Sequence, residues 1–486
     1  MLGISKFIPI KREELAKFLV VSFIMVMILF IYSAERAVKD TIIVGDESMG
    51  AEALSAIKLF GTLPSAILVM IVYTKLSNSL NKTVIFHLFN VFFVSYFLFF
   101  TFFIQKDADS FHLDLASLKE SVPSFRYVIA AVEKWSYSLY YIFAELWGSV
   151  MLSLTFWQTA NQVFKVDEAK RLYPLFGFVA QLGLIASGEI VMFFSNKEKF
   201  SGGWEETVSY INTAVLVAAV ILSVLYWVLS NKIVSSDIIN AETKQKKKKK
   251  PGLVESLKYV FSSKYIGLIA ALIVCYGVSI NIVEGVWKAQ AKIVYPNQQD
   301  YSAFMAYLQR YTAIASMICM LMGSYMLRLI SWRVAAMLTP IAIFFTGGAF
   351  FIFSIYQNEV TGLLPFLTVA PVVIAVIMGL AQNVLAKSVK YAFFDATKEM
   401  AYIPLDEALK SKGKAAADVI GGRLGKSGGA LLQQFLLFLI PGSSLITLSP
   451  KLSVIFVFVM IAWVVAVNSL SKEFDKLNSQ RSENIE

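Results

Sequence analysis

Residues 231–252 read NKIVSSDIINAETKQKKKKKPG, and this polar stretch decides how the chain is organised. It contains Lys244, an unbroken lysine run from Lys246 to Lys250, and the pair Pro251-Gly252. Long apolar stretches lie on both sides of it, so we interpret the segment as a solvated tether between two parts of the chain. Attraction of the lysine run to anionic lipid headgroups is the alternative interpretation.

The sequence on either side of the tether is unusually apolar. Hydrophobic residues make up 57% of the 486 residues and charged residues only 16%, whereas soluble domains carry about 25% charged residues. A helix that spans a bilayer needs about 20 largely apolar residues. Twelve stretches meet this need, six on each side of the tether, and they centre near Phe23, Leu68, Phe93, Trp147, Leu182, Val217, Ala271, Met317, Ile343, Val372, Leu431 and Val459.

This pattern predicts the fold class. We expect an all-α membrane protein of about twelve transmembrane helices in two six-helix bundles, residues 1–230 and 253–486, joined by a cytoplasmic linker at residues 231–252. Two six-helix halves joined in this way are typical of major-facilitator-type transporters. The expectation rests on topology by analogy, because no clear sequence repeat relates the halves.

The distribution of lysine and arginine predicts the orientation. If the helices alternate, the loops on one side are rich in Lys and Arg, and the opposite loops are mixed or acidic, as at Asp107 and Asp109. The positive-inside rule then places both termini in the cytoplasm. The first apolar stretch has no small-residue cleavage site, so we expect a membrane helix there rather than a signal peptide. A bacterial cytoplasmic membrane is favoured over a plastid, because Glu13 and Glu14 are untypical of a transit segment.

Composition also excludes several classes of function. The two cysteines, Cys275 and Cys319, lie in apolar runs, and neither they nor His87 and His112 form a cluster with metal-ligand spacing. We therefore expect no metal site, no cofactor and no catalytic triad. The net charge of +10 is compatible with nucleic acid, anionic lipid or an anionic solute, but nucleic acid is least favoured because no soluble basic domain is present.

Charged residues within the first-half spans are the most informative, since each costs at least about 2.5 kcal/mol to insert. Arg36 and Lys39 share one helical face, and Asp40, four residues after Arg36, is placed to pair with it. A charged cap at the membrane surface is the alternative. Lys58 begins the second span, where a snorkelling lysine is the simplest interpretation. Glu145 lies well inside the fourth span, where a carboxylate needs a cation or a proton.

The second half carries a matching set. Glu284 lies toward the outer end of the seventh span, where a pair with Lys288 is the simpler alternative to a transport role. Arg310 in the eighth span is a further candidate cation, and Lys426 lies deep in the eleventh span. Basic groups on several spans predict a cationic site suited to a multivalent anion. The carboxylates beside them can hold the cations when the site is empty, or accept hydrogen bonds from a base or ribose.

Residues 420–427, IGGRLGKS, resemble a Walker A loop but depart from it. The pattern requires glycine five positions before Gly425, where this sequence has Ile420. No buried strand precedes the segment, and an apolar span follows it. We interpret its glycines as sites of close helix packing or of freed backbone N–H groups.

At these residues the sequence resembles a known family, the ATP/ADP translocases of the non-mitochondrial type, which are nucleotide transporters of bacteria and plastids. The resembling segments occur in both halves and are long and idiosyncratic at the C-terminal side. They are residues 39–41 (KDT), 145–150 (ELWGSV), 168–177 (EAKRLYPLFG), 394–405 (FDATKEMAYIPL), 412–416 (KGKAA) and 424–430 (LGKSGGA).

The resemblance implies a carrier that exchanges nucleotides across a membrane. By motif, the two lysines and two glutamates that matter in the family fall on Lys39, Glu145, Glu284 and Lys426, with weaker flanks at Glu284. Lys39 and Lys426 would meet the phosphates, with Arg36 or Arg310 as helpers. Residues 35–38 depart from the sequence pattern of the family's ATP/ADP exchangers, so the base of the transported nucleotide is left undecided.

We therefore expect a nucleotide transporter that exchanges nucleoside triphosphate for diphosphate, with ATP and ADP the leading pair, by alternating access. The partners expected are nucleotides and membrane lipids. One alternative is a proton-coupled or one-way nucleotide carrier of other base specificity. An integral membrane transferase is the alternative from another class, but the sequence has no Asp-rich membrane motif. A lipid scaffold does not explain ionisable groups on so many spans.

Overall fold

The computed structural model describes residues 10–234, 263–357, 359, 362, 369–405 and 407–483. A few side chains within these ranges, including that of Lys426, are not described. The described residues form helices and no strand. In the first half these are η1 (Arg12–Glu14), α1 (Leu15–Gly45), α2 (Ala53–Ala56), η2 (Ile57–Thr62), α3 (Leu63–Ser79), α4 (Lys82–Phe99), η3 (Phe100–Ile104), η4 (Gln105–Asp107), α5 (Ala108–Phe111), α6 (Ala116–Ser121), η5 (Pro123–Phe125), α7 (Arg126–Glu133), α8 (Trp135–Trp147), η6 (Gly148–Phe156), α9 (Trp157–Val163), α10 (Val166–Phe194), α11 (Gly203–Val228) and η7 (Leu229–Ile233).

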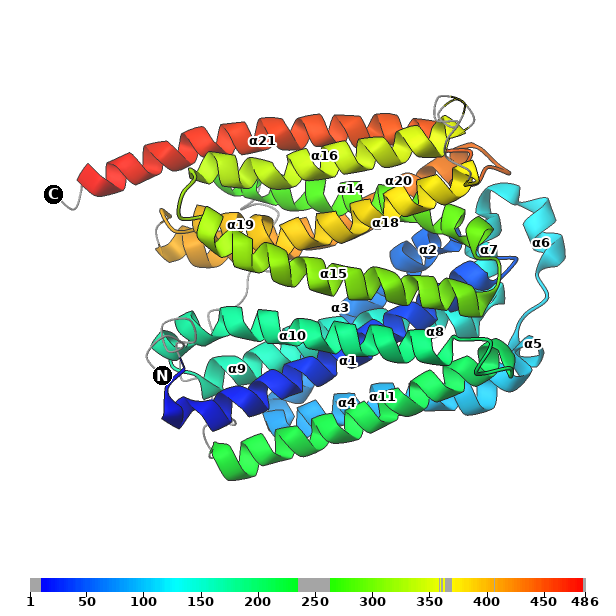
Figure 1. Cartoon of the computed structure of the whole chain (residues 1–486), viewed down its shortest axis with the longest axis horizontal. Helices are drawn as coiled ribbons and strands as arrows, with labels where there is room; N and C mark the ends of the chain where they lie inside the picture. The colour runs from blue at the N-terminus through cyan, green and yellow to red at the C-terminus, as the bar shows by residue number, and fades with distance from the viewer. Residues whose placement is uncertain are drawn as a thin grey trace.

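The second half has a similar set of long helices. They are α14 (Lys264–Val294), α15 (Gln298–Met326), α16 (Trp332–Ile355), α18 (Pro371–Val389), η8 (Lys390–Phe394), α19 (Asp395–Ala401), α20 (Glu407–Leu439) and α21 (Ser449–Glu483). The two sets form two layers of roughly parallel helices (Figure 1). The linker at residues 231–252 lies almost wholly outside the described residues, so the domain boundaries stay a prediction.

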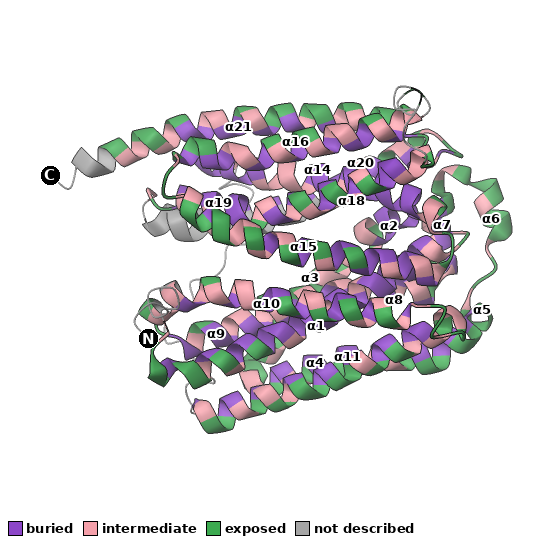
Figure 2. Cartoon of the chain, in the orientation of Figure 1, coloured by how far each residue is buried: buried purple, intermediate pink, exposed green. Residues whose placement is uncertain are grey.

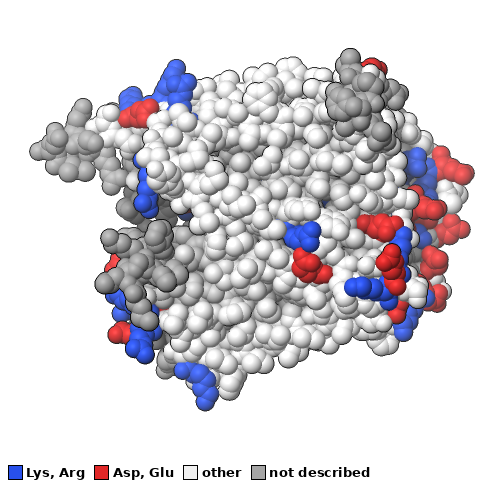
Figure 3. Space-filling model, viewed as in Figure 1, with Lys and Arg blue, Asp and Glu red and all other residues white. Residues whose placement is uncertain are grey.

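Membrane-spanning helices account for the fold, as the sequence predicted. Ten helical segments of the described chain are long and apolar enough to cross a bilayer. Two more long helices, α15 and α20, contain the predicted centres Met317 and Leu431 but carry more polar residues. Helices suit lipid because they satisfy their own backbone hydrogen bonds. Exposed residues alternate with buried ones along the outer helices (Figure 2), and charges gather at the two ends of the molecule (Figure 3).

The Walker-like segment is helical. Residues 420–427 lie within α20, so they form no phosphate-binding loop. Their glycines pack against α14 instead, because a Cβ on Gly277 would lie 2.5 Å from the backbone of Gly425. The close approach of these two helices confirms the packing interpretation of the glycines.

The two halves meet at the end of the molecule opposite the termini, which we call the outer end (Figure 1). There the backbone N–H of Leu445 donates to Glu52 Oε1 at 2.9 Å, and Ser55 Oγ donates to Gln434 Oε1 at 2.9 Å. The Tyr127 hydroxyl donates to the carbonyl of Ser443 at 3.2 Å. Burial raises the pKa of Tyr127 to about 12, so its hydroxyl keeps the proton that it donates.

The end that carries the termini is different. Its ion pairs between described residues stay within one half, as in Lys17–Glu168 at 2.8 Å and Lys264–Glu473 at 2.7 Å. The described halves are therefore tied by polar contacts at the outer end, and no ion pair between described residues joins them at the end that carries the termini.

Candidate functional site

A buried carboxylate, Asp40 of α1, joins the two halves near the outer end. Its Oδ1 lies 3.1 Å from Lys39 Nζ of the same helix, and its Oδ2 lies 2.9 Å from Lys288 Nζ of α14. The side chains of all three residues are no more than 3% exposed. Because a buried carboxylate is stable only when it is paired and hydrogen-bonded, these cations hold Asp40 in its ionised form.

The ion pairs continue in both directions from Asp40. Glu284 Oε1 lies 3.4 Å from Lys288 Nζ and 2.9 Å from Arg36 Nη2, so a second contact crosses between the halves. On the other side, Lys39 Nζ lies 2.7 Å from Glu145 Oε1 of α8. The result is one connected network of three cations and three carboxylates, which we call the central network: Arg36, Glu284, Lys288, Asp40, Lys39 and Glu145.

Helical spacing explains how few elements supply this network. Arg36, Lys39 and Asp40 occupy positions three and four apart on α1, and Glu284 and Lys288 occupy positions four apart on α14. Tyr141 of α8 adds its ring, whose centroid lies 3.9 Å from Lys39 Nζ. A ring face at this distance stabilises a desolvated ammonium group.

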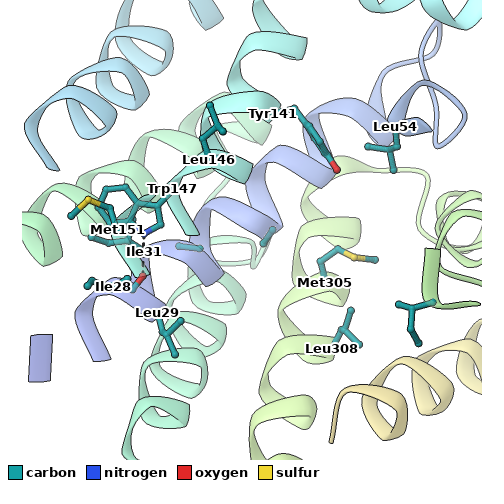
Figure 4. Packing of buried hydrophobic residues seen from close by; sticks show 14 of the residues in the cluster. Ile28, Leu29, Ile31, Leu54, Tyr141, Leu146, Trp147, Met151, Met305 and Leu308 are labelled. Carbon is teal, nitrogen blue, oxygen red and sulfur yellow. Dashed lines mark hydrogen bonds between the residues drawn. The ribbon is translucent and has the colours of Figure 1, made fainter. Parts of the chain in front are cut away.

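Two buried tryptophans fix the helices that carry these charges. The indole N–H of Trp147, two residues after Glu145, donates to the carbonyl of Ile28 on α1 at 3.1 Å. Figure 4 shows this bond within the packed apolar residues around α1 and α8. In the second half, Trp287 donates to the carbonyl of Val376 on α18 at 2.9 Å and packs against Gly379, where any side chain would clash. Each tryptophan therefore holds a charged neighbour in place.

A separate cavity lies closer to the outer end. It has a volume of about 450 Å³ and is lined by Ile42, Gln105, Tyr137 and Trp204, among others. Its lining contains Glu205 and no lysine or arginine. The cavity does not suit a polyphosphate, so the cationic site is the one around the central network.

Comparison with known proteins decides the family. The family model described as TLC ATP/ADP transporter matches residues 4–474, which is almost the whole chain. The chain belongs to the TLC ATP/ADP transporter family. ADP,ATP carrier protein 1 of Rickettsia prowazekii is 42% identical over 477 residues, 96% of this chain and 95% of that protein, and ADP,ATP carrier protein 3 of Rickettsia bellii is 41% identical over 490 residues. Family membership makes the chain a multi-pass membrane transporter and not an enzyme, and it confirms the resemblance found in the sequence.

Solved structures confirm the fold. The nucleoside transporter NupG superposes with a TM-score of 0.59 at 10% identity, covering 94% of this chain and 99% of NupG. A D-xylose-proton symporter superposes with a TM-score of 0.56 at 13% identity, covering 94% of this chain and 97% of the symporter. At such low identity the likeness concerns the fold alone, which is the major-facilitator type that the sequence predicted.

The structure brings together four of the six predicted site residues of this family member. Lys39, Glu145, Glu284 and Arg36 all belong to the central network. Lys426 lies on α20, which packs along α14, but its side chain lies outside the described residues. The role of these residues in binding substrate stays a proposal.

Arg310 is not brought to the network. Its Nη1 lies 2.9 Å from Glu189 Oε1 of α10, and its guanidinium lies 5.1 and 5.2 Å from the ring centroids of Tyr307 and Tyr311. These rings are 40% and 44% exposed, so Arg310 lies on an outward face of the helix pair α10–α15. The sequence placed Arg310 in a span but could not specify which face of that helix points inward.

Three local expectations need correction. Asp40 was expected to pair with Arg36, but its partners are Lys39 and Lys288, because Arg36 reaches Glu284 instead. The alternative of a surface cap is wrong, since Lys39 is only 1% exposed. Lys58 does not snorkel: its Nζ donates to Asn281 Oδ1 on α14 at 3.1 Å.

Sequence reasoning missed one cation of the network and one further lysine inside a span. Lys288 was noted only as a neighbour of Glu284, although it bridges both halves. Lys387 of α18 was not singled out, although it lies within the span Pro371–Ala401. A single lysine inside the apolar stretch Pro371–Val389 was the signal that could have revealed it.

Proposed function

We propose that the chain exchanges ATP for ADP by alternating access between its two halves. The observation that carries the proposal is an excess of positive charge between the halves. Four cations and three carboxylates lie together there, leaving one positive charge: Arg36, Lys39, Lys58 and Lys288 against Asp40, Glu145 and Glu284. The names of the relatives, ADP,ATP carrier proteins, support the choice of nucleotide.

This excess charge favours a multivalent anion as cargo. A sugar gives the cations nothing to pair with, whereas a di- or triphosphate supplies several acceptor oxygens and the opposite charge. The interaction is stronger between the halves than in water, because the effective dielectric constant is lower there. Lys39, and Lys426 by family motif, are the proposed phosphate ligands, with Arg36 as helper.

The carboxylates serve the empty carrier. Glu145 and Glu284 hold Lys39 and Arg36 at 2.7 and 2.9 Å, so these cations are not left unpaired when no anion is bound. A phosphate group that enters takes over part of this pairing. The contacts Asp40–Lys288 and Arg36–Glu284 cross between the halves, so both must break when the outer end opens.

The direct test is uptake by purified protein in liposomes. Labelled ATP should enter ADP-loaded vesicles and be recovered inside as unchanged ATP, because a carrier moves its substrate without changing it chemically. Recovery of a labelled lipid or of free phosphate made by the protein would favour a transferase. No uptake of any nucleotide would overturn the proposal, and exchange of GTP, CTP or UTP instead would change only the base.

Proton-coupled transport is the second candidate, and one residue favours it. Glu35 of α1 is fully buried and accepts a hydrogen bond from the Tyr140 hydroxyl at 2.5 Å, while its Oε1 has no partner among the described residues. No cation of the described chain pairs with it, so this carboxyl is the group suited to carry a proton.

Replacing Glu35 by glutamine tests the two candidates against each other. If the protein is an exchanger, Glu35→Gln should retain roughly the wild-type rate of ATP/ADP exchange, because glutamine keeps the size of the side chain and an oxygen that can accept the hydrogen bond from Tyr140. If transport is proton-coupled, the variant should lose uptake driven by an imposed pH gradient. The measurement is labelled ATP uptake with and without that gradient.

We propose that the protein lies in a bacterial cytoplasmic membrane with both termini in the cytoplasm. The lysine-rich linker and the basic loops support this orientation. In a variant with Cys275 and Cys319 replaced by serine, a cysteine at Lys248 should react with an impermeant thiol reagent only from the cytoplasmic side. A cysteine at Ser117, exposed on the short helix α6 at the outer end, should react only from outside. The reverse pattern would contradict the orientation.

A further inference from the structure

The cavity near the outer end is closed on one side by the second half of the chain. All but one of its lining residues belong to the first half, and the exception is Gln298, the first residue of α15. Gln298 packs directly on Gly45, the last residue of α1, where an added Cβ would lie 2.6 Å from Gln298 Cγ. The cavity is therefore complete only when the two halves meet at the outer end.

Two further contacts fix the start of α15 over the cavity. Gln299 Nε2 donates to Thr207 Oγ1 of α11 at 3.0 Å, and both residues are buried. Lys292 Nζ, near the end of α14, donates to the carbonyl of Gly45 at 3.0 Å. Because these contacts join opposite halves, they break when the outer end opens, and Gln298 then leaves the cavity.

The lining of the cavity combines aromatic rings with amide groups. Phe100, Tyr137 and Trp204 supply the rings, and Gln105 and Gln298 supply the amides. Gln105 is only 7% exposed, and its Oε1 has no hydrogen-bond partner in the described part of the chain. A buried amide that lacks a partner costs free energy, so a ligand that pairs with this amide gains affinity.

Two features at the exposed side of the cavity add a carboxylate and backbone donors. Glu205 contributes the carboxylate and is exposed. The N-cap residue of α11 is Gly202, which has no side chain to accept from the first N–H groups of that helix, so these groups need other acceptors. The volume of about 450 Å³ lies within the usual range of small-molecule sites, roughly 300–1,000 Å³.

A nucleoside matches this lining group by group. Its base stacks on an aromatic ring, and an amide such as that of Gln105 pairs with the donor and the acceptor on a base edge. Its ribose hydroxyls donate to a carboxylate, here that of Glu205. The described lining contains no lysine or arginine and Glu205 repels phosphate, so a nucleoside is preferred to a nucleotide.

We propose that this cavity binds a nucleoside and that the bound nucleoside holds the outer end closed. Gln298 reaches the ligand only in the closed arrangement, so the ligand binds that arrangement more tightly and shifts the population toward it. A carrier held in one arrangement does not alternate, so the nucleoside inhibits transport. This inhibition rests on the proposed exchange, whereas the binding itself does not.

Binding is tested on the purified full-length protein with labelled adenosine, which has a base and a ribose without phosphate. In Trp204→Leu and in Glu205→Gln the dissociation constant of adenosine should rise roughly tenfold, since each variant removes one stacking or charge-assisted contact. Glu198→Gln is the matched control, because it removes an exposed carboxylate that precedes α11 but does not line the cavity. This variant should bind adenosine like the wild type.

Transport provides a second measurement. Adenosine should slow labelled ATP uptake by wild-type liposomes, and Glu205→Gln should keep its uptake but need roughly tenfold more adenosine for the same inhibition. The proposal would be overturned if the wild type binds tetramethylammonium but not adenosine, if all variants bind adenosine equally, or if Glu205→Gln is inhibited like the wild type. If adenosine binds through Glu205 but the liposomes exchange no nucleotide, the nucleoside site stands and the proposed ATP/ADP exchange falls.

Discussion

Replacing Lys39 by methionine is expected to reduce ATP/ADP exchange roughly a hundredfold or more. Lys39 pairs with both Asp40 and Glu145 and is only 1% exposed, so its loss leaves the buried Asp40 and the partly exposed Glu145 each short of a cation. Removing one partner of a buried ion pair typically lowers the stability of the folded protein by about 3–5 kcal/mol. The variant should therefore lose both stability and a phosphate ligand, measured as melting temperature and as the initial rate of labelled ATP uptake.

A double variant separates these two losses. In Lys39→Met combined with Glu145→Gln, one stranded carboxylate is removed, so the melting temperature should return toward that of the wild type. Exchange should stay low, because the missing cation is not restored. Recovery of exchange together with stability would show that Lys39 acts only as a structural partner of Glu145, and its proposed role as a phosphate ligand would be wrong.

Replacing Asp40 by asparagine is expected to weaken the contact between the two halves at the outer end. Asp40 is the acceptor that Lys288 of the other half contacts at 2.9 Å, and asparagine keeps the shape but not the charge. Losing one partner of such a buried pair between two surfaces costs roughly 2–5 kcal/mol. This is enough to move a closed outer end substantially toward its open state.

A cysteine pair can report this change. Gly45 and Gln298 are in contact at the outer end, where a Cβ on Gly45 would lie 2.6 Å from Gln298 Cγ. In a background without Cys275 and Cys319, cysteines at these two positions should cross-link readily, and Asp40→Asn should slow the cross-linking roughly tenfold or more. Asp114→Asn changes an exposed carboxylate at the same end and should have no effect. Equal cross-linking in Asp40→Asn would show that the central network does not hold the halves together.

The fold was predictable because lipid imposes a simple requirement on the sequence. A helix must cross about 30 Å of hydrocarbon, so its apolar run is visible in one dimension. Helices α15 and α20 have the weakest apolar pattern in the sequence, since polar residues such as Gln309 in α15 face the other half. Ser33 of α1 donates to Gln309, a contact between halves that composition alone does not reveal.

The site was predictable in part, for the same reason. Charges in lipid are rare enough that Lys39, Glu145 and Glu284 could be selected from the sequence. Their partners could not, because helical spacing relates only residues on one helix, whereas Asp40–Lys288 and Arg36–Glu284 depend on how α1 meets α14. Arg310 was selected but lies outside the network, for a related reason. The sequence identified its span but not the face of the helix on which it lies, which points outward.

Exchange itself follows from the charge of the empty site. A cavity with uncompensated cations is costly to close, because desolvating an unpaired charge costs several kcal/mol. A bound polyphosphate removes this cost, so the loaded carrier should change state faster than the empty one. The carboxylates Asp40, Glu145 and Glu284 offset most of the charge, but the four cations Arg36, Lys39, Lys58 and Lys288 still exceed them by one.

The most direct test compares labelled ATP uptake by liposomes loaded with ADP and by empty liposomes, each with and without a protonophore. The account predicts rapid uptake only with internal ADP, at a rate that the protonophore leaves unchanged. Equal uptake by loaded and empty vesicles, or uptake that disappears when the proton gradient is collapsed, would contradict exchange driven by the nucleotides themselves.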